Sequence, residues 1–468
     1  MTVAPNRTGH RPGIVLLAVS LGQFLIQLDL TAVNVALPAI GHGLNASVSS
    51  LQWVVDGYNL AVASLLLVSG RIGDRRGHKR LYLIGLAVFG IGSALCAVAP
   101  TAGSLIGFRV LQGIGAAIEL PATLAILSHT FTEPRQRAQA IGIWAGAAGS
   151  SLVIGPVIGG ALVAVSGWRT VFLINLPVIM AIAVLTLLAV RETAEPGAGG
   201  LDLPGLALGS ATLALLAGSA IEGGRLGATT LPLTLFGAGL VGLVGFVLVA
   251  RRRPDPVLPL ELFRRAGYAA ANVCGLGMGF VTIGLLFVFG LFFQQVQGRI
   301  AIAAGLRFLP LTVAFVVTGP LIGRLIDRVG ARIPMSVGAG LLALGALALL
   351  PIDAGSGYQA VGWPFMIIGV GYGLLSTPMA AAVLGSVPAE RAGLASSTNL
   401  TARLVGGVFG IAVLGALLPD QDHPQFAQAF IGGLHNAMII VVIVAAVASI
   451  MAATLIRSHG PSRRARRP

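Results

Sequence analysis

The chain has 468 residues, of which 56% are hydrophobic and only 10% are charged, and its mean hydropathy is +0.91. In water-soluble domains about a quarter of all residues are charged, so this composition excludes a soluble protein and indicates an integral membrane protein. The net charge of +14 comes from 30 Lys and Arg residues against 16 Asp and Glu residues.

Polar stretches divide the sequence into about fourteen apolar runs, each close to the roughly twenty residues that cross a bilayer. The first run, residues 13–37, is longer than the apolar core of a signal peptide, so we expect an uncleaved membrane helix. The runs follow one another closely and leave little room for a soluble domain. We therefore expect an all-α polytopic membrane protein.

The distribution of basic residues predicts the orientation of the chain. With both termini cytoplasmic, most Lys and Arg residues fall in inner connections, as the positive-inside rule describes. Few fall in outer connections: Arg169, Arg225, Arg299 and Arg307. The positive charge is thus explained by topology, and we expect no nucleic-acid partner. The arginines within residues 463–467 are expected to lie on anionic lipid headgroups.

Several classes of chemistry are excluded by the residues themselves. Lys79 is the only lysine and lies between His78 and Arg80, so neither a nucleotide-binding P-loop nor a lysine Schiff base is possible. The sequence has no His-Glu-x-x-His and no Gly-x-Ser-x-Gly motif. Cys96 and Cys274 are expected at opposite ends of their helices and cannot form a disulfide. We expect no enzyme, no metal and no cofactor, and an ion gradient as the source of energy.

Asp29 lies inside the first apolar run, where a carboxylate is costly enough that a functional role is the first interpretation. At about 100° per residue, Gln23, Gln27 and Asn34 share one stripe, which is suited to lining a substrate cavity. Asp29 falls on another side of the helix, among small residues that allow a neighbouring helix to approach closely. We expect Asp29 to take part in proton coupling.

Asp56 belongs to the second run, which begins near residue 51. It lies about one and a half turns from the outer boundary, so a proton-coupling acid and a solvated interfacial acid are equal alternatives.

A charged turn follows the second run and recurs in the second half of the chain. The stretch GRIGDRRGHKR begins at residue 70, and GRLIDRVGARI begins at residue 323 with the same spacing. The matching positions are Gly70, Arg71, Asp74, Arg75, Gly77 and Lys79 in the first copy and Gly323, Arg324, Asp327, Arg328, Gly330 and Arg332 in the second. A further match between residues 134–138 and 388–392 supports two related halves. We expect gating at Gly70, Asp74, Arg75, Gly77, Asp327 and Arg328.

The fourth helix, expected over residues 103–128, carries charges of both signs on one face. Arg109, Gln112 and Glu119 share a polar stripe. Arg109 lies at a depth where either Asp29 or Asp56 is a plausible partner, and a structural ion pair and a proton relay remain equal alternatives. Glu119 lies several turns deeper, and a proton-coupling role is favoured over a structural one. Gln112 is expected to line the substrate cavity.

The fifth run, GIWAGAAGSSLVIGPVIGGAL, places glycines around a proline. Glycine at this spacing lets helices touch and bend, and nothing in the run is reactive. We expect a packing surface or hinge with a gating role at Gly155, Pro156 and Gly159.

Together these motifs resemble those of the major facilitator superfamily. The turn at residues 70–80 resembles its loop 2/3 signature, and Arg109 with Gln112, Gly113 and Gly115 resembles its helix 4 signature. Its antiporter signature, which is associated with export, is matched by Gly155, Pro156, Gly159 and Gly160. LDLTAVNVALP, WRTVFLINLP and QQVQGR are similar to segments of the fourteen-helix drug:proton antiporter branch. The resemblance covers nearly the whole chain and implies export, but it does not identify the substrate.

The spacing of the repeat predicts the domain organisation. The two charged turns follow the second and tenth runs, two runs farther apart than two six-helix halves would place them. The runs at residues 203–221 and 231–250 are therefore expected to be an insertion, and the resemblance implies the same arrangement. We expect a six-helix half over residues 1–190, a linker with two inserted helices over 191–265, and a second six-helix half with a basic tail over 266–468.

The second half has no acidic residue within a predicted helix. Its buried polar candidates for the substrate cavity are Asn272 and Arg403, whereas His435 is expected to be a satisfied core or interface residue.

The expected function is export of amphipathic drugs or antibiotics across a bacterial cytoplasmic membrane, by a monomer that exchanges them for protons. In this interpretation Asp29 or Glu119 takes a proton from outside and releases it inside after the halves move. Export of an endogenous metabolite or lipid is an alternative that the motifs do not distinguish. A non-transporting sensor or a passive channel is less favoured, because no soluble sensor domain is visible and a channel does not need paired halves with buried acids.

Overall fold

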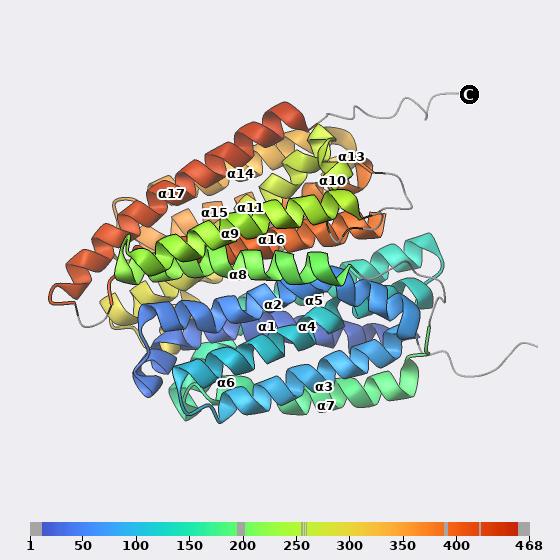
Figure 1. Ribbon diagram of the computed structural model, residues 1–468, viewed down its shortest axis with the longest axis horizontal. Coiled ribbons are helices and arrows are strands. Elements are labelled where there is room, and N and C mark those ends of the chain that lie inside the picture. Colours follow the sequence, from blue (N-terminus) through green and yellow to red (C-terminus); the bar gives the residue numbers. More distant parts are fainter. Residues whose placement is uncertain are drawn as a thin grey trace, which may run out of the picture.

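The computed structural model describes residues 12–193, 202–253, 256, 258, 260–387, 392–420 and 423–456. Its first group of helices, the N-terminal bundle, packs around α1 and α4 (Figure 1). It comprises α1 (Pro12–Leu44), α2 (Val48–Arg76), α3 (His78–Ala97), α4 (Ala102–Thr130), α5 (Pro134–Ser166), α6 (Thr170–Leu173) and α7 (Asn175–Ala189).

The second group, the C-terminal bundle, packs around α11 and α15. It comprises α10 (Leu260–Phe263), α11 (Ala266–Leu291), the π-helical turn η1 (Phe292–Val296), α12 (Ala301–Leu306), α13 (Leu309–Val329), α14 (Arg332–Ala348), α15 (Tyr358–Gly385), α16 (Ala392–Gly415) and α17 (Phe426–Leu455). Figure 1 shows the two bundles side by side.

Two further helices, α8 (Leu203–Leu226) and α9 (Thr230–Arg252), correspond to the two runs expected to be an insertion, and we call them the inserted pair. α8 packs against α2 of the N-terminal bundle and against α16 of the C-terminal bundle, and α9 packs on α8. Figure 1 shows both helices, in green, along the boundary between the bundles. Large apolar side chains of α9, such as Val241 and Val244, are exposed, as a lipid-facing helix requires.

Local sequence signals explain several helix ends. At the start of α2 the Ser47 hydroxyl accepts a hydrogen bond from the backbone of Ser50, and Thr101 and Ser104 form a reciprocal capping box on α4. α5 begins with Pro134, whose missing N–H costs nothing in the first turn. The helix starts are therefore encoded locally, although their packing is not.

Eleven helical segments within the described residues are long and apolar enough to cross a membrane. A twelfth is obtained if the two parts of α5, which are bent by 40° between Ser151 and Ile154, count as one span. The number of about fourteen expected from the sequence is thus not confirmed by length and composition. The all-helical membrane architecture is the predicted one.

The bundles are joined at the end of the molecule that carries the α1–α2 and α16–α17 connections, which we call the α1–α2 end. There the amide of Gln52 on α2 donates to the carbonyls of Ile411 and Ala412 on α16, at 2.8 and 3.1 Å. The backbone N–H of Val48 donates to the Asp420 carboxylate at 3.1 Å. These bonds close this end in the present conformation.

A core of phenylalanines reinforces the same end of the C-terminal bundle. Phe289, Phe292 and Phe293 are fully buried and pack edge-to-face or tilted against one another, with ring centroids 5.7 Å apart. Phe308 and Phe365 extend this core across α13 and α15. Such aromatic pairs add stabilisation beyond their buried area, so the closed end is also a rigid one.

Candidate functional site

A buried ion pair joins α1 and α4. The guanidinium Nη1 of Arg109 lies 2.6 Å from the Oδ2 of Asp29, and both side chains have no exposed surface. Since a charge alone in a membrane interior is very costly, each residue explains the burial of the other. The alternative partner considered for Arg109, Asp56, is not part of the pair.

Three neutral side chains complete this ion-pair cluster. The amides of Gln112 and Asn175 both donate to the Oδ1 of Asp29 at 2.9 Å. The same amides lie 2.8 and 2.9 Å from the Ser93 hydroxyl, and the carbonyl oxygen of Gln112 accepts from Arg109 at 2.6 Å. Both Asp29 oxygens are therefore satisfied by α4 and α7, and a polar network of this kind is rigid.

Aromatic rings enclose the other face of the guanidinium. The Arg109 Cζ lies 4.3 Å from the centre of the Tyr58 ring and 5.8 Å from that of Phe172. Its Nε donates to the Val54 carbonyl at 3.2 Å, whereas Nη2 has no partner among the described residues. The cluster is thus a fixed junction of α1, α2, α4 and α7, with cation–π contacts adding to the ion pair.

Glu119 lies on the same helix as Arg109 but apart from this cluster. Ten residues of helix separate the two, which is about 15 Å along the axis. Glu119 is fully buried, and neither carboxyl oxygen has a hydrogen-bond partner among the described residues. It packs where α1, α3 and α4 cross, since a methyl group added at Gly22 would overlap both its carboxyl and the Tyr82 hydroxyl. The two buried acids therefore have opposite environments.

Asp56 is also fully buried without a partner among the described residues, and the same holds for the side chain of Asn59 one turn later. The solvated interfacial alternative for Asp56 was therefore wrong. Gln52 precedes it by one turn and bonds to α16, while Leu60 follows by one turn and packs with Val408 of α16. Asp56 consequently lies at the contact between the two bundles.

The residues predicted to line the substrate cavity do not gather in one place. Gln23 and Asn34 are buried on α1, each with a carbonyl oxygen that has no partner in the described part of the chain. Gln27 is half-buried on the same helix, and Arg403 is half-buried on α16. Gln112 belongs to the ion-pair cluster, and Asn272 lines a separate pocket near the inserted pair. Their roles in substrate binding stay predictions.

The first charged turn is held by a carboxylate from the end of α7. The Glu192 oxygens accept the backbone N–H groups of Lys79 and Arg80, each at 3.0 Å, and so cap the N-terminus of α3. Gly77 has a φ of +96°, and a Cβ at this position would overlap Glu192, so both its backbone and its lack of a side chain are required. The ammonium of Lys79 donates to the Leu187 carbonyl at 3.1 Å.

The remaining gating predictions are only partly within the described residues. A Cβ added at Gly70 would lie 3.7 Å from Pro121 on α4, and Arg75 lies in the last turn of α2. The side chains of Asp74, Asp327 and Arg328, like the arginine-rich tail beyond residue 456, lie outside the described residues.

The glycines of α5 lie at a junction between the bundles. A Cβ at Gly159 would lie 2.7 Å from the Ala32 backbone on α1, and one at Gly155 would overlap the Thr31 hydroxyl. On the opposite side, Gly160 meets Ile302 of α12, and the Pro156 carbonyl meets Gly305. The motif thus allows α5 to contact α1 and α12 at backbone distance, which agrees with the predicted packing surface.

Comparison with known proteins decides the family. The sequence model described as the Major Facilitator Superfamily matches residues 19–411, from α1 to most of α16, with α17 outside the match. The chain belongs to the major facilitator superfamily.

Curated relatives of this superfamily member carry resistance names. The Multidrug resistance protein Stp of Mycobacterium tuberculosis is 37% identical over 407 residues, which cover 86% of this chain and 75% of the relative. The Methylenomycin A resistance protein of Streptomyces coelicolor is 35% identical over 424 residues, covering 90% and 89%. The Tetracenomycin C resistance and export protein of Streptomyces glaucescens is 36% identical over 413 residues, covering 88% and 77%.

Solved structures agree on the fold. A bacterial homolog of the human lysosomal transporter Spinster, in an inward-facing and unoccupied conformation, aligns with a TM-score of 0.68 over 96% of this chain and 98% of the other, at 20% identity. A likeness at this identity shows the fold alone. The superfamily assignment suggested by the sequence motifs is thus confirmed, whereas the fourteen-helix branch is not.

Several residues of this transporter's site were not predicted from the sequence. Ser93 and Asn175 complete the ion-pair cluster, Tyr58 and Tyr82 lie beside the buried charges, and Glu192 caps α3. Asn175 had a readable signal, because it is an amide within the apolar stretch FLINLP. The partners of Ser93 and Glu192 depend on helix packing, which no local pattern encodes.

Proposed function

We propose that this chain exports amphipathic drugs or antibiotics across the bacterial cytoplasmic membrane in exchange for protons. The resistance names of its relatives support the substrate class. In this proposal both termini are cytoplasmic, the transporter acts as a monomer, and the proton gradient replaces any cofactor. The α1–α2 end is then the outer side of the membrane.

The observation that carries proton exchange is the difference between Glu119 and Asp29. Asp29 accepts hydrogen bonds from Arg109 and from two amides, so both of its oxygens already have partners. Glu119 has no such partner among the described residues and sits in a low-dielectric interior, where the neutral, protonated carboxyl avoids the cost of an unpaired charge. A group that holds a proton when buried and releases it when water reaches it is suited to carry that proton across.

The proposed cycle uses this difference. In the present arrangement, closed at the α1–α2 end, Glu119 is buried and protonated. Water that reaches α1, α3 and α4 from the inner side hydrates the carboxyl and releases the proton there, and the carboxyl takes up the next proton when the outer side is open. The Asp29–Arg109 pair stays neutral as a whole and keeps α1 and α4 together as the bundles move. Asp56, at the α2–α16 contact, is a second acid through which proton uptake affects the contact between bundles.

We further propose that the chain crosses the membrane fourteen times. Besides the eleven apolar segments and bent α5, the remaining two are α2 and α14. α2 has 29 residues and is long enough, but the polar residues of its last turns lower its mean hydropathy. α14 has 17 residues and is slightly short. Residues 1–190 and 266–468 then form the two halves, with the insertion at residues 191–265.

Purified protein reconstituted into liposomes with an imposed pH gradient tests the exchange. A panel of antibiotics and lipophilic dyes is presented, and substrate uptake and proton movement are recorded together. We expect Glu119→Gln to fold, because the amide is isosteric, and to lose at least about tenfold of gradient-driven transport.

Glu222→Gln is the matched control, since Glu222 pairs with Arg225 on the surface at the end of α8 and should leave transport unchanged. Gradient-driven export that persists in Glu119→Gln rejects Glu119 as the proton carrier. Export of the same compounds that is indifferent to collapse of the gradient rejects the exchange itself. Transport of lipids or metabolites but of no drug in the panel favours the endogenous-substrate alternative.

A further inference from the structure

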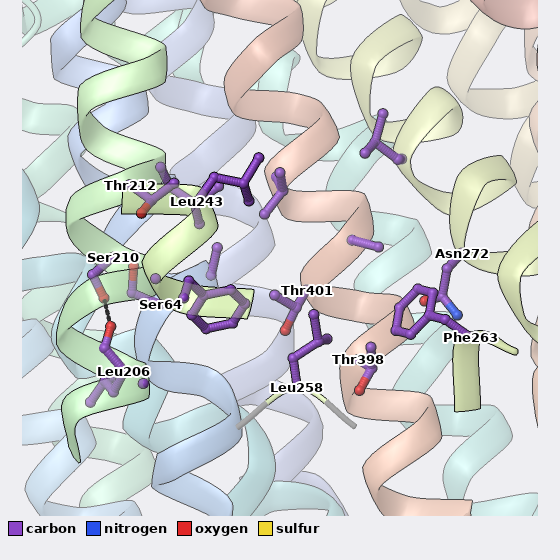
Figure 2. Close-up of a pocket in the computed structure, with 18 of the residues that line it drawn as sticks. Ser64, Leu206, Ser210, Thr212, Leu243, Leu258, Phe263, Asn272, Thr398 and Thr401 are labelled. Carbon is purple, nitrogen blue, oxygen red and sulfur yellow. Dashed lines mark hydrogen bonds between the residues drawn. The ribbon is translucent and has the colours of Figure 1, made fainter. Parts of the chain in front are cut away.

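A pocket of about 300 Å³ lies where the inserted pair meets both bundles. Its walls come from α2, α8, α9, α11 and α16 and from the connection between α9 and α11 (Figure 2). The lining residues belong to the later half of α2, to the first halves of α8 and α11 and to residues 398–405 of α16, so the pocket lies away from the closed α1–α2 end. It is separate from the ion-pair cluster and from Glu119.

The lining combines a large apolar surface with a few polar groups. Leu206, Leu213, Leu243, Phe246, Phe263 and Leu276 supply most of the apolar surface, and Figure 2 shows the labelled polar residues Ser64, Ser210, Thr212, Asn272, Thr398 and Thr401 around the space. No charged residue is among its lining residues in the described part of the chain. Apolar pockets of this size with a few polar groups are typical of small-molecule sites, and the absence of charge favours a neutral occupant.

Three polar groups of the pocket have no partner among the described residues: the carbonyl oxygen of Asn272 can only accept, whereas the hydroxyls of Thr212 and Thr401 can donate or accept. Asn272 is 3% exposed, and its amide nitrogen donates to the Tyr268 carbonyl at 2.9 Å, but its carbonyl oxygen has no partner among the described residues. The buried Thr401 hydroxyl also has none. The hydroxyls of Ser210 and Thr398 already donate to backbone carbonyls at 2.8 Å, so they can only accept. A ligand with a hydroxyl or N–H group would satisfy groups that are otherwise costly to bury.

We propose that this pocket is an access site for neutral amphipathic molecules that carry a hydrogen-bond donor and enter from the bilayer beside α9. Its walls belong to both bundles, so a movement of one bundle against the other changes its shape. A molecule bound there is therefore linked to the conformational cycle. The inserted pair is thereby a part of the substrate path rather than a passive addition. The transport role of the pocket rests on the proposed export function, whereas ligand binding does not.

Photo-crosslinking of the full-length protein in lipid nanodiscs tests binding without a pH gradient. The probe is 4-(hydroxymethyl)benzophenone, which has an apolar body, one hydroxyl donor and a ketone that attaches to nearby C–H groups on illumination. We expect saturable attachment to peptides of α8, α11 and α16, located by mass spectrometry. Attachment that rises without saturation, as for a molecule dissolved in bulk lipid, overturns the site.

Two substitutions separate pocket filling from general effects on the protein. Ala402→Trp places an indole in the pocket and should reduce attachment at least about tenfold. Val241→Trp adds the same side chain on the exposed face of α9, where the residue is 74% exposed, and should leave attachment unchanged. Equal attachment in both variants overturns the site.

An isosteric change keeps the test valid even if Ala402→Trp fails to fold. Thr401→Val removes the unpartnered hydroxyl and should weaken the hydroxylated probe about three- to tenfold. It should not weaken diphenylmethane, a competing probe with neither a donor nor an acceptor, and Thr234→Val on the exposed face of α9 should affect neither probe. An equal loss for both probes, or none for either, overturns the hydrogen-bonding role.

The transport arm uses the compound exported by the wild type in liposomes. Ala402→Trp should slow its export and Val241→Trp should not; normal export by a folded Ala402→Trp variant overturns the access role. Saturable probe binding without gradient-driven export of any compound overturns the proposed function and leaves the binding site standing.

Discussion

At the scale of single residues, the transporter treats its buried acids in two ways. Asp29 is paired with an arginine and accepts hydrogen bonds from two amides. Glu119 lies against the α1 backbone and a tyrosine, and its carboxyl oxygens have no hydrogen-bond partner among the described residues. An acid that is already paired is poorly placed to exchange protons, because each protonation leaves Arg109 as an uncompensated charge. We therefore expect Asp29 to act in structure and conformational coupling, and Glu119 to carry the proton.

Substitution of the ion pair tests this assignment. Asp29→Asn should lower the free energy of unfolding by about 3–5 kcal/mol, since it leaves a buried guanidinium unpaired. Arg109→Gln should have a similar effect, but the double variant should be less destabilised than the sum of the two, because it removes both charges. Thermal unfolding of the four purified proteins measures this coupling. Additive losses would show that the two side chains do not stabilise each other.

At the scale of elements, α5 is a helix that contacts both bundles. It bends by 40° between Ser151 and Ile154, and after this bend it contacts α1 through Gly155 and Gly159 and α12 through Gly160. Because these contacts are made by backbone, they tolerate sliding but not an added side chain.

Two glycine substitutions on α5 separate packing from helix propensity. Gly159→Ala places a methyl group 2.7 Å from the Ala32 backbone and should cost about 1–3 kcal/mol of stability together with most of the transport. Gly142→Ala meets nothing within 4 Å and should stabilise the helix by up to about 1 kcal/mol. Unfolding temperatures and transport rates of both variants provide the measurement. If the two variants behave alike, the close approach at Gly159 has no role.

At the scale of the whole molecule, the bundles are joined at one end by hydrogen bonds to backbone groups. Gln52 bonds to α16, Val48 to Asp420, and the amide of Gln294 donates to the Val35 carbonyl on α1 at 2.9 Å. Each such hydrogen bond contributes only a modest net free energy, so a few of them can break during each transport cycle. Because they are directional, they also define the geometry of the closed state.

A reversible crosslink at this end tests the closed state. Val48→Cys and Asp420→Cys, joined by a short bis-methanethiosulfonate reagent, should hold the bundles closed and abolish transport, and reduction should restore it. The native Cys96 and Cys274 are buried, so we expect them not to react with the reagent. Each single cysteine variant treated with the same reagent is the control. Undiminished transport in the crosslinked protein would mean that this end does not open.

The sequence predicted the membrane class, the superfamily and the burial of Asp29, Arg109 and Glu119, because hydropathy, spacing and the cost of buried charge are local properties. It left open which acid pairs with Arg109. It also left open whether Asp56 is a proton-coupling acid or a solvated interfacial acid, since both questions depend on which helices meet. The pocket around Asn272 was also out of reach, because its walls come from segments more than a hundred residues apart in the chain.

The turn capped by Glu192 has a practical consequence. Lys79 is the only lysine in the chain, it is half-exposed, and its ammonium lies beside the end of α7. Amine acylation therefore has a single side-chain target, and endoproteinase Lys-C has a single peptide bond to cut. A membrane-impermeant acylating reagent should label this position in inside-out vesicles but not in right-side-out vesicles, with Lys79→Arg correcting for the N-terminal amine. Labelling from the opposite side would reverse the proposed orientation, so the native chain already contains its own marker of sidedness.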